Sequence, residues 1–258
     1  MLSKETLDSY RRMTPGERLA LTFEMIQENT PYLLAGRTTW SIADSNCSAA
    51  KTIGETNGSS PRSLRCGQAP PRLMTDLTAV IHDLIDVFEK LRLPYAIMGG
   101  IAVRAHGIPR PTYDVDFTLA VPRERLDELF LVIADRGYTI PEQYTRGWVD
   151  EVGGMPLVKV RLFLEGRTID ADIFIAETSF QREVIDRRIR TEVGGQTVHL
   201  VTAEDLILFK LVASRPRDLL DIQDILFTQG QLDETYLRRW AGPLGVEAKL
   251  DDVLASRE

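Results

Sequence analysis

Apolar and polar positions recur with two different spacings along this chain, and together they predict an α/β protein. Within residues 5–30 the apolar side chains recur at helical spacing, and Pro15 can begin a helical turn after Thr14. We therefore expect one amphipathic helix or a helical pair there. A further helix is expected after Met74 and should end at Pro94, with apolar positions at Leu77, Val80, Ile81, Leu84, Ile85 and Phe88.

Short apolar segments bounded by turn residues predict strands in the rest of the chain. We expect strands at Tyr95–Met98 and Asp114–Val121, followed by an amphipathic helix at Arg123–Arg136. Two hairpins are expected next, around the turns Glu165-Gly166 and Gly194-Gly195, with strands at Leu157–Leu164, Thr168–Ala176, Arg190–Val193 and Thr197–Val201. From Ala203 onward the pattern is helical.

Composition divides the chain near residue 73. Residues 1–37 are predicted to be an N-terminal helical appendage, and residues 38–73, rich in Ser, Thr, Gly, Asn and Pro, a flexible or disordered linker. Residues 74–201 form the predicted core and residues 202–258 a C-terminal helical region. Because Met74 is a plausible domain start, we hypothesise that residues 1–73 are an appended element, such as a small partner or an upstream frame read through.

The composition is that of a soluble globular protein, with 43% hydrophobic and 27% charged residues. The apolar runs are too short to span a bilayer and the N-terminus lacks the apolar segment of a signal peptide, so we expect no membrane partner and a cytoplasmic location. Residues 74–258 hold 22 basic and 31 acidic side chains. Such an acidic body does not attract nucleic acid over its whole surface, so any RNA contact needs a local basic patch.

The segment from Met98 to Phe117 carries the strongest chemical signal. Asp114 and Asp116 stand two residues apart on a predicted strand and therefore project from the same face. Like charges this close are costly unless a cation lies between them, and Mg²⁺ (or Mn²⁺), which normally brings substrate phosphates, is the natural occupant. Gly99 and Gly100 follow a predicted strand, where backbone N–H groups can face a triphosphate without Cβ interference.

A third carboxylate is expected from the predicted strand at Thr168–Ala176, because a two-metal phosphoryl-transfer site usually takes one from a neighbouring strand. Asp172 is the preferred candidate and Asp170 the alternate, since both face away from the apolar side of that strand. The carboxylate nearest the acceptor would take the proton of its hydroxyl, while the metals align the acceptor oxygen and the α-phosphate. Asp114, Asp116 and Asp172 are therefore the predicted metal ligands and catalytic residues.

Lys210 lies in an otherwise apolar helical segment, where an unpaired ammonium would be costly. Two interpretations remove that cost and need not exclude each other. Lys210 either contacts a substrate phosphate, as a catalytic and nucleotide-binding residue, or forms an internal salt bridge with one of the aspartates that follow it. Asp218 and Asp221, three residues apart on one helix face, are candidates for such a bridge, as is Asp224.

Other polar side chains carry weaker signals. Arg187, Arg188 and Arg190 form the best basic patch, which is either a solvated surface cluster or a contact for an RNA backbone. The histidines His82, His106 and His199 have no ligand spacing and are interpreted as packing or surface residues. Cys47 and Cys66 indicate neither a disulfide framework nor a metal site.

Gly99-Gly100 followed by Arg110-x-Thr112-x-Asp114-x-Asp116 resembles the signature of the nucleotidyltransferase superfamily to which DNA polymerase beta belongs. The later segment from Lys210 to Asp221, with Arg215, Arg217 and Asp218, looks like the second conserved motif of AbiEii/MenA-like toxin nucleotidyltransferases. The resemblance implies a nucleotidyltransferase fold with a small mixed sheet flanked by helices. It also implies an NTP, such as ATP, held with the metal by the nucleotide-binding residues Gly99, Gly100, Arg110, Thr112 and Lys210.

The same resemblance implies transfer of a nucleoside monophosphate to an acceptor hydroxyl. In toxin relatives the acceptor can be the 3′ end of tRNA, and a cognate antitoxin is encoded alongside. Many family members carry Gly-Ser where this chain has Gly99-Gly100, so a serine hydroxyl contact to the phosphates is absent here. Backbone amides can still serve that role.

Three alternatives to a toxin compete with it. In the first alternative, an enzyme of the same class has a small molecule such as an aminoglycoside as its acceptor. The acidic body favours such a cationic substrate. Asp-x-Asp also holds a metal on nucleotide-sugars in glycosyltransferases, but those folds usually place several strand–helix units before the motif. A catalytically degenerate binding or antitoxin-like module is disfavoured by the retention of Asp114, Asp116, Asp172 and Lys210.

Overall fold

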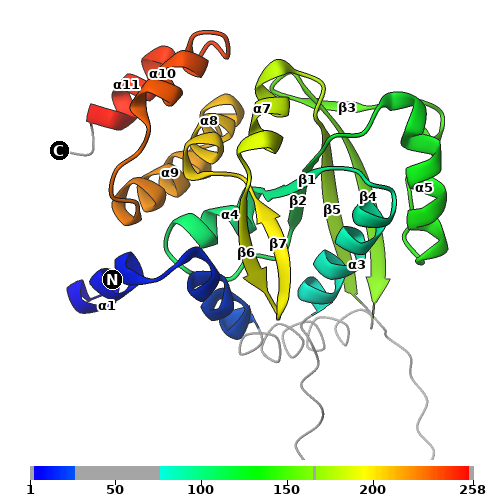
Figure 1. The fold of residues 1–258 in the computed structure, drawn as a ribbon, viewed down its shortest axis with the longest axis horizontal. Coiled ribbons are helices and arrows are strands. Elements are labelled where there is room, and N and C mark those ends of the chain that lie inside the picture. The colour runs from blue at the N-terminus through cyan, green and yellow to red at the C-terminus, as the bar shows by residue number, and fades with distance from the viewer. Residues whose placement is uncertain (1–2, 27–75, 165–166, 256–258) are drawn as a thin grey trace, which may run out of the picture.

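A mixed β-sheet with helices on both faces forms the centre of the protein (Figure 1). The computed structural model describes residues 3–26, 76–164 and 167–255. Within these residues seven strands form one sheet in the order β3-β4-β5-β2-β1-β7-β6. Their bounds are β1 Tyr95–Met98, β2 Val115–Leu119, β3 Asp150–Val152, β4 Met155–Leu164, β5 Arg167–Ile175, β6 Ile189–Val193 and β7 Gln196–Leu200. The predicted α/β class with a mixed sheet is confirmed.

Helices precede, connect and follow these strands. In chain order they are α1 Lys4–Arg12, α3 Asp76–Lys90, α4 Gly99–His106, the short 3₁₀ helix η1 Arg123–Arg125, α5 Leu126–Asp135, α6 Glu142–Thr145, α7 Ser179–Arg187, α8 Ala203–Ala213, α9 Pro216–Thr228, α10 Glu234–Ala241 and α11 Glu247–Ala255. Residues 15–26 are also helical, so the N-terminal segment is a helical pair, as the sequence allowed. Helices α3 and α5 pack on one face of the sheet and α7 to α11 on the other (Figure 1).

The sheet combines antiparallel and parallel pairs. Strand β1 runs antiparallel to β2, and β2 runs parallel to β5, which itself forms the predicted hairpin with β4. On β2, Val115, Phe117 and Leu119 are fully buried on the α3 side, as the alternation predicted. Because side chains alternate across a strand, Asp116 projects to the opposite face, toward the C-terminal helices.

Two apolar clusters, one on each side of the sheet, form the core. The first joins α3 and α5 to the inward side chains of the central strands, and Phe88 packs edge-on against Phe117 at 5.2 Å between ring centroids. The second joins α7 to α11, where Phe180 packs against Phe209 at 5.1 Å. Asp116 of β2 therefore faces the layer of C-terminal helices, whereas Asp170 of β5, on the same face, is 46% exposed.

The second helix of the N-terminal pair, residues 15–26, belongs to the first of these clusters. Leu19, Phe23 and Ile26 are buried in it. The buried guanidinium of Arg18 donates to the carbonyl oxygen of Ala105, in the last turn of α4, at 2.8 Å. A cation at a helix C-terminus interacts favourably with the helix dipole. The predicted linker 38–73, with both cysteines, lies outside the described residues, and the proposed division into domains remains a prediction.

Several predicted boundaries were wrong. The helix after Met74 ends at Lys90 rather than at Pro94, because Arg92 adopts a left-handed conformation (φ 55°) and the Leu93 N–H donates back to the Phe88 carbonyl at 2.8 Å. Strand β2 begins at Val115, so Asp114 precedes the strand instead of opening it. The predicted helix Arg123–Arg136 is divided into η1 and α5.

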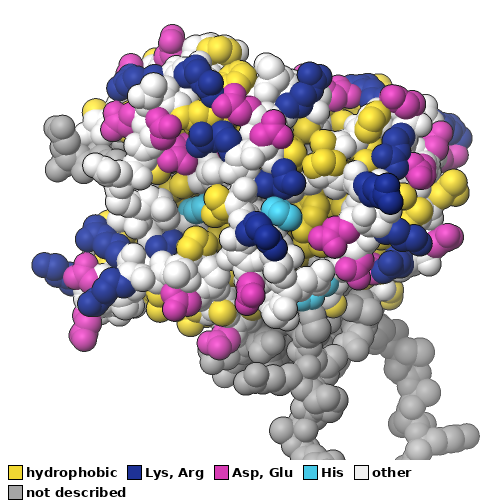
Figure 2. All heavy atoms as spheres, viewed as in Figure 1, with side chains coloured by type: hydrophobic (Ala, Val, Ile, Leu, Met, Phe, Trp, Pro, Cys, Tyr) yellow, Lys and Arg dark blue, Asp and Glu magenta, His cyan; other side chains and the backbone are white. Residues whose placement is uncertain are grey.

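The surface mixes charges of both signs. Figure 2 shows Lys and Arg interspersed with Asp and Glu over the whole visible face, without a broad area of one sign. In the part of the chain that the structure describes, no helix combines the length and apolar character needed to cross a membrane.

Candidate active site

The sequence-predicted residues converge on one cavity of about 540 Å³ between the sheet and helices α4, α8 and α9. Every candidate ligand and nucleotide contact lines it: Gly99, Gly100, Arg110, Thr112, Asp114, Asp116, Asp170, Asp172 and Lys210. Six further charged side chains join them: Arg104, Lys159, Arg215, Arg217, Asp218 and Asp221. The carboxylates on and just before β2 and on β5 form a carboxylate side of the cavity. A cationic side consists of Arg104, Arg110, Lys210, Arg215 and Arg217, and Asp218 and Asp221 lie among these cations.

The glycine turn between β1 and α4 lies directly against Asp116. Gly99 has a positive φ of 60°, and a Cβ built on it would lie 1.8 Å from Asp116 Oδ2. The Gly100 N–H points at the same oxygen, 3.4 Å away. The N-cap residue of α4, Met98, makes no side-chain hydrogen bond, and the Asp116 carboxylate is the side-chain acceptor at the first turn. The other backbone N–H groups and the dipole at a helix N-terminus favour an anion.

Thr112 closes the other side of this turn. A Cβ built on Gly100 would lie 2.5 Å from Thr112 Oγ1, which is the atom nearest to it. The threonine hydroxyl therefore fills the space next to the first turn of α4 that a side chain at position 100 would need.

Asp116 and Asp172 are register partners on the neighbouring parallel strands β2 and β5. Side chains at such paired positions project from the same face of the sheet. Burial raises the pKa of Asp116 to about 6; the negative charge of Asp172 is the next contribution, and Asp114 adds to it. The Gly100 N–H and Lys210 act in the opposite direction. The site thus holds a carboxylate that is costly to ionise without a cation.

Cations on β4 pair with the carboxylates of β5. Lys159 Nζ lies 2.6 Å from Asp172 Oδ2, and the Arg161 guanidinium donates to both oxygens of Asp170, at 2.6 and 3.0 Å. Lys159 was not identified from the sequence. The signal was present, because counting back from the predicted turn at residues 165–166 pairs Lys159 with Asp172 across the hairpin.

Lys210 is buried and forms the predicted internal salt bridges. Its Nζ lies 2.8 Å from Asp218 Oδ1 and 2.8 Å from Asp221 Oδ2. Burial opposes the ionisation of Asp218, yet hydrogen bonds from Arg215 and Lys210 hold its pKa below the usual value. The ion-pair interpretation of Lys210 is confirmed, and its contact with a phosphate remains a prediction.

Asp221 is shared by three cations. Besides Lys210, its Oδ1 accepts from Arg104 at 2.7 Å and from Arg110 at 2.5 Å. Arg104 is fully buried, and burial, followed by the nearby Arg110 charge, lowers its pKa to about 10. Arg110 is one-third exposed and lines the cavity. Neither Arg104 nor the sharing of Asp221 was predicted, because α4 and α9 are far apart in sequence.

The predicted basic patch does not form a continuous surface. The Arg187 guanidinium stacks on the Tyr236 ring, 3.5 Å from its centroid, and faces Glu204 at 3.7 Å. Arg188 donates to the Ile185 carbonyl oxygen, and Arg190 is exposed. Two of the three guanidinium groups are therefore engaged within the protein, so the three arginines do not form the solvated cluster that was predicted, and an RNA contact remains a prediction.

The histidines have local packing roles, as expected. His106 Nε2 lies 2.8 Å from the Val201 carbonyl oxygen, and His82 Nε2 lies 2.7 Å from the Val193 carbonyl oxygen. The His199 ring packs edge-on against Tyr95. None of the three lines the cavity.

The β3–β4 hairpin borders the cavity where the sheet meets the C-terminal helices. A Cβ built on Gly153, in the hairpin turn, would lie 2.4 Å from Val212 Cγ1 of α8. The neighbouring residues Val152 and Met155 line the cavity. The sequence predicted neither β3 nor this contact.

No ready-made metal site is present among residues 3–26, 76–164 and 167–255. Within them, no group of three or more His, Cys, Asp or Glu side chains converges closely enough to hold a metal ion. Asp116 and Asp172 are paired in register, but Asp172 already accepts from Lys159.

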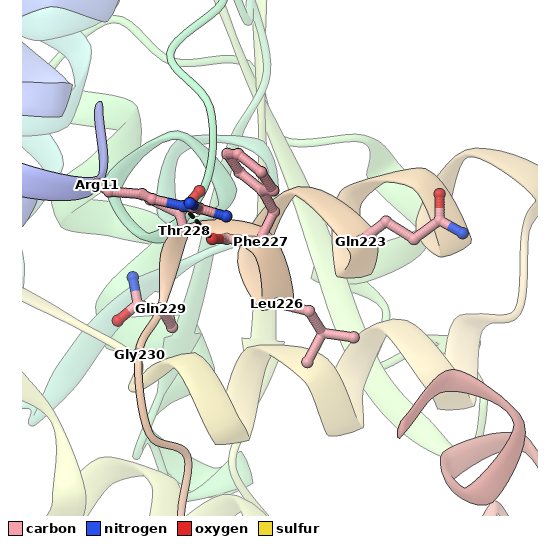
Figure 3. A pocket seen from close by; sticks show the side chains of 7 residues that line it. All are labelled: Arg11, Gln223, Leu226, Phe227, Thr228, Gln229 and Gly230. Atoms are coloured by element: carbon pink, nitrogen blue, oxygen red, sulfur yellow. Dashed lines mark hydrogen bonds between the residues drawn. The ribbon is translucent and has the colours of Figure 1, made fainter. Parts of the chain in front are cut away.

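A second hollow, of about 620 Å³, lies between α1 and the end of α9 (Figure 3). The Arg11 guanidinium stacks on Phe227, 3.8 Å from the ring centroid, and its Nε donates to the Phe227 carbonyl oxygen at 3.0 Å. None of its lining residues is a carboxylate, so it offers no acid–base or metal chemistry.

Comparison with solved structures gives weak similarities to nucleotidyltransferases. An antigenic nucleotidyltransferase-like protein from Paracoccidioides brasiliensis is 20% identical, with a TM-score of 0.39 over 70% of this chain and 92% of that one. ANT(2'')-Ia in complex with adenylyl-2''-tobramycin is 18% identical, with a TM-score of 0.40 over 71% and 97%. The lincosamide antibiotic adenylyltransferase LnuA, with lincomycin bound, is 20% identical, with a TM-score of 0.38 over 58% and 96%.

No known family profile matches the chain, and no curated protein sequence does. Similarity to solved structures at this level does not define a function.

Proposed function

We propose that the protein is a metal-dependent nucleotidyltransferase that moves a nucleoside monophosphate from an NTP to an acceptor hydroxyl. One observation carries the proposal. The register partners Asp116 and Asp172 share one cavity with Lys210 and Arg110, both paired with Asp221, and with the N-terminus of α4. A polyanionic substrate and a cation can be bound together in such a cavity, as phosphoryl transfer requires.

The donor chemistry of the carboxylate side suits a divalent cation, and the described side chains would have to move together to hold one. Oxygen donors are the ligands that Mg²⁺ and Mn²⁺ prefer, and Asp116 and Asp172 carry like charges at paired positions on one face. Asp114, exposed at the start of β2, is the third proposed ligand, with Asp170 as the alternate to Asp172. The bound metal would neutralise phosphate charge and align the NTP with the acceptor.

The cationic side fits the triphosphate. The backbone N–H groups at Gly99 and Gly100, the Thr112 hydroxyl and the Arg110 guanidinium lie at one end of the cavity. Asp221 holds Arg110 in place, which reduces the entropy that the arginine side chain would lose on binding a phosphate. Lys210, itself fixed by Asp218 and Asp221, supplies positive charge behind this surface.

Asp116 or Asp172 is the proposed proton acceptor for the attacking hydroxyl. The acceptor is a hydroxyl on the 3′ end of tRNA, in a toxin with a cognate antitoxin, or a hydroxyl on a small aminoglycoside-like molecule.

The test is a transfer assay with each α-³²P-labelled NTP and Mg²⁺. Total RNA, an aminoglycoside panel and the protein alone serve as acceptors, with Asp116→Asn as the matched inactive variant. Label on tRNA supports the toxin function, and label on the small molecule supports the alternative. If no acceptor is labelled and NTP binding is equally weak in both proteins, the nucleotidyltransferase proposal is wrong.

A further inference from the structure

Lys159 places a positive charge directly on Asp172, the proposed metal ligand that is the register partner of Asp116. It stands opposite Asp172 in the β4–β5 register, and its Nζ lies 2.6 Å from Asp172 Oδ2. The Asp172 side chain is 26% exposed and Lys159 is 47% exposed. The ammonium group therefore lies within the cavity wall and is not buried in the core.

A divalent cation that uses the carboxylates of Asp116 and Asp172 would need the same Asp172 carboxylate. Two cations on one carboxylate repel each other, so the metal and the Lys159 ammonium compete. We propose that Lys159 is the resident counter-ion of the site, which a divalent cation must displace, and that it thereby limits the affinity of the protein for the metal. This inference rests on the proposed function.

The arrangement explains how the carboxylates coexist before a metal binds. Asp114, Asp116, Asp170 and Asp172 all line the cavity, and like charges held together destabilise the folded state unless they are compensated. Lys159 provides a compensating positive charge opposite Asp172, which is the register partner of Asp116 on β5. Removing it leaves a more negative site, which binds a divalent cation more tightly.

The same hairpin offers a matched control. Arg161 pairs with Asp170 across the same two strands, two residues further along. That pair is more exposed, at 58% and 46%, and Asp170 has no register partner on β2, since the pairing begins at Val115 and Ala171. Arg161→Met removes an equivalent cross-strand ion pair but frees no carboxylate beside Asp116.

The experiment measures binding of Mn²⁺ alone to the full-length chain by electron paramagnetic resonance. The proteins are the wild type, Lys159→Met, Lys159→Gln and Arg161→Met, each with and without Asp116→Asn. Lys159→Met and Lys159→Gln should lower the Mn²⁺ dissociation constant about fivefold, the size expected for loss of one partly exposed competing charge. Arg161→Met should change it less than twofold, and Asp116→Asn should weaken binding in every background.

The outcomes separate this inference from the proposed function. If Asp116→Asn weakens binding but neither Lys159 variant strengthens it, Lys159 is an ordinary cross-strand ion pair and the inference is wrong. If Mn²⁺ binding is insensitive to Asp116→Asn, or absent from all proteins, both the proposed metal site and the inference are wrong. Binding seen only in the Lys159 variants supports the inference. Thermal melts of each variant confirm that the folded protein is measured.

Discussion

The hydroxyl oxygen of Thr112 lies 2.5 Å from the position that a Cβ on Gly100 would occupy. Real Cβ atoms do not approach another atom this closely, so residues 100 and 112 constrain each other. The resemblance described in the sequence analysis implies a serine at position 100, where this chain has glycine. In the structure, the hydroxyl of Thr112, in the segment that leads into β2, lies next to position 100.

Gly100→Ala should therefore lower stability by about 1–3 kcal/mol, the usual cost of overpacking a tight site. Adding Thr112→Ala should restore most of it, because the nearest remaining threonine atom, Cβ, lies at 3.4 Å, which is an ordinary contact. Denaturant melts of the two single variants and the double variant measure the coupling. Equal losses in the single and double variants would show that the two side chains do not compete for space.

NTP binding can separate the effect of the Thr112 hydroxyl from the effect of the side-chain volume. Thr112→Val keeps the volume and removes the hydroxyl, so it should weaken NTP binding without changing stability by more than about 1 kcal/mol. The double variant with Gly100→Ser and Thr112→Ala returns a hydroxyl to the same space and should recover part of the affinity. Fluorescence titration with a labelled NTP measures each dissociation constant, and unchanged affinity in Thr112→Val would exclude a hydroxyl contact.

Lys210 is the buried counter-ion of two aspartates, so its removal should be costly. Lys210→Met leaves Asp218 and Asp221 with less compensation in a buried site, and we expect a loss of about 3 kcal/mol in unfolding free energy. The double variant Lys210→Met with Asp218→Asn should recover part of that loss, because one uncompensated charge is removed. Lys90→Met, at the exposed end of α3, is the control for a general effect of losing a lysine, and an equal loss there would contradict this role.

Asp116 should make the protein less stable as pH rises through the region from about 4 to 6. Its folded-state pKa of about 6 lies above the unfolded value of 3.8, so the folded protein binds more protons between these values and loses stability as they are released. Asp116→Asn lacks this proton and should be more stable than the wild type at pH 8, by about 1–3 kcal/mol, but not at pH 4.

Urea denaturation of both proteins at several pH values measures this difference. Asp135→Asn, exposed on α5, is the matched control for changing one surface carboxylate. A gap between Asp116→Asn and the wild type that does not widen with pH would show that Asp116 is not held in a costly environment.

The N-terminal helical pair should be needed for stable folding of the rest. Leu19, Phe23 and Ile26 share the core of α3 and the central strands, and Arg18 donates to the last turn of α4. A fragment of residues 74–258 should therefore be insoluble or molten, as judged by thermal melting and ANS binding. A soluble fragment with a cooperative transition would support the hypothesis of an appended element. Adding residues 1–37 as a separate chain tests rescue.

Local patterns predicted the strands and helices well because their causes are local. The alternation on β2 placed Phe117 in the core and Asp116 on the other face, which is a property of any strand. Helix ends were less predictable: the left-handed Arg92 ends α3 early, and nothing in the composition of that segment marks it.

Pairings between distant segments account for what was missed. The parallel contact of β2 with β5, which brings Asp116 beside Asp172, was assumed from the chemistry rather than read from a pattern. Arg104 could be found only by bringing α4 against α9, where it meets Asp221. Lys159 is different, since its partner follows from simple counting around a hairpin that was correctly predicted.

Gly153 lies where the β3–β4 turn touches Val212 of α8, at the edge of the cavity. A Cβ at position 153 would clash with the Val212 side chain, and the backbone there has a positive φ of 58°, which glycine adopts most easily. A larger residue at this position should therefore push the hairpin away from α8 and move Val152 and Met155, which line the cavity.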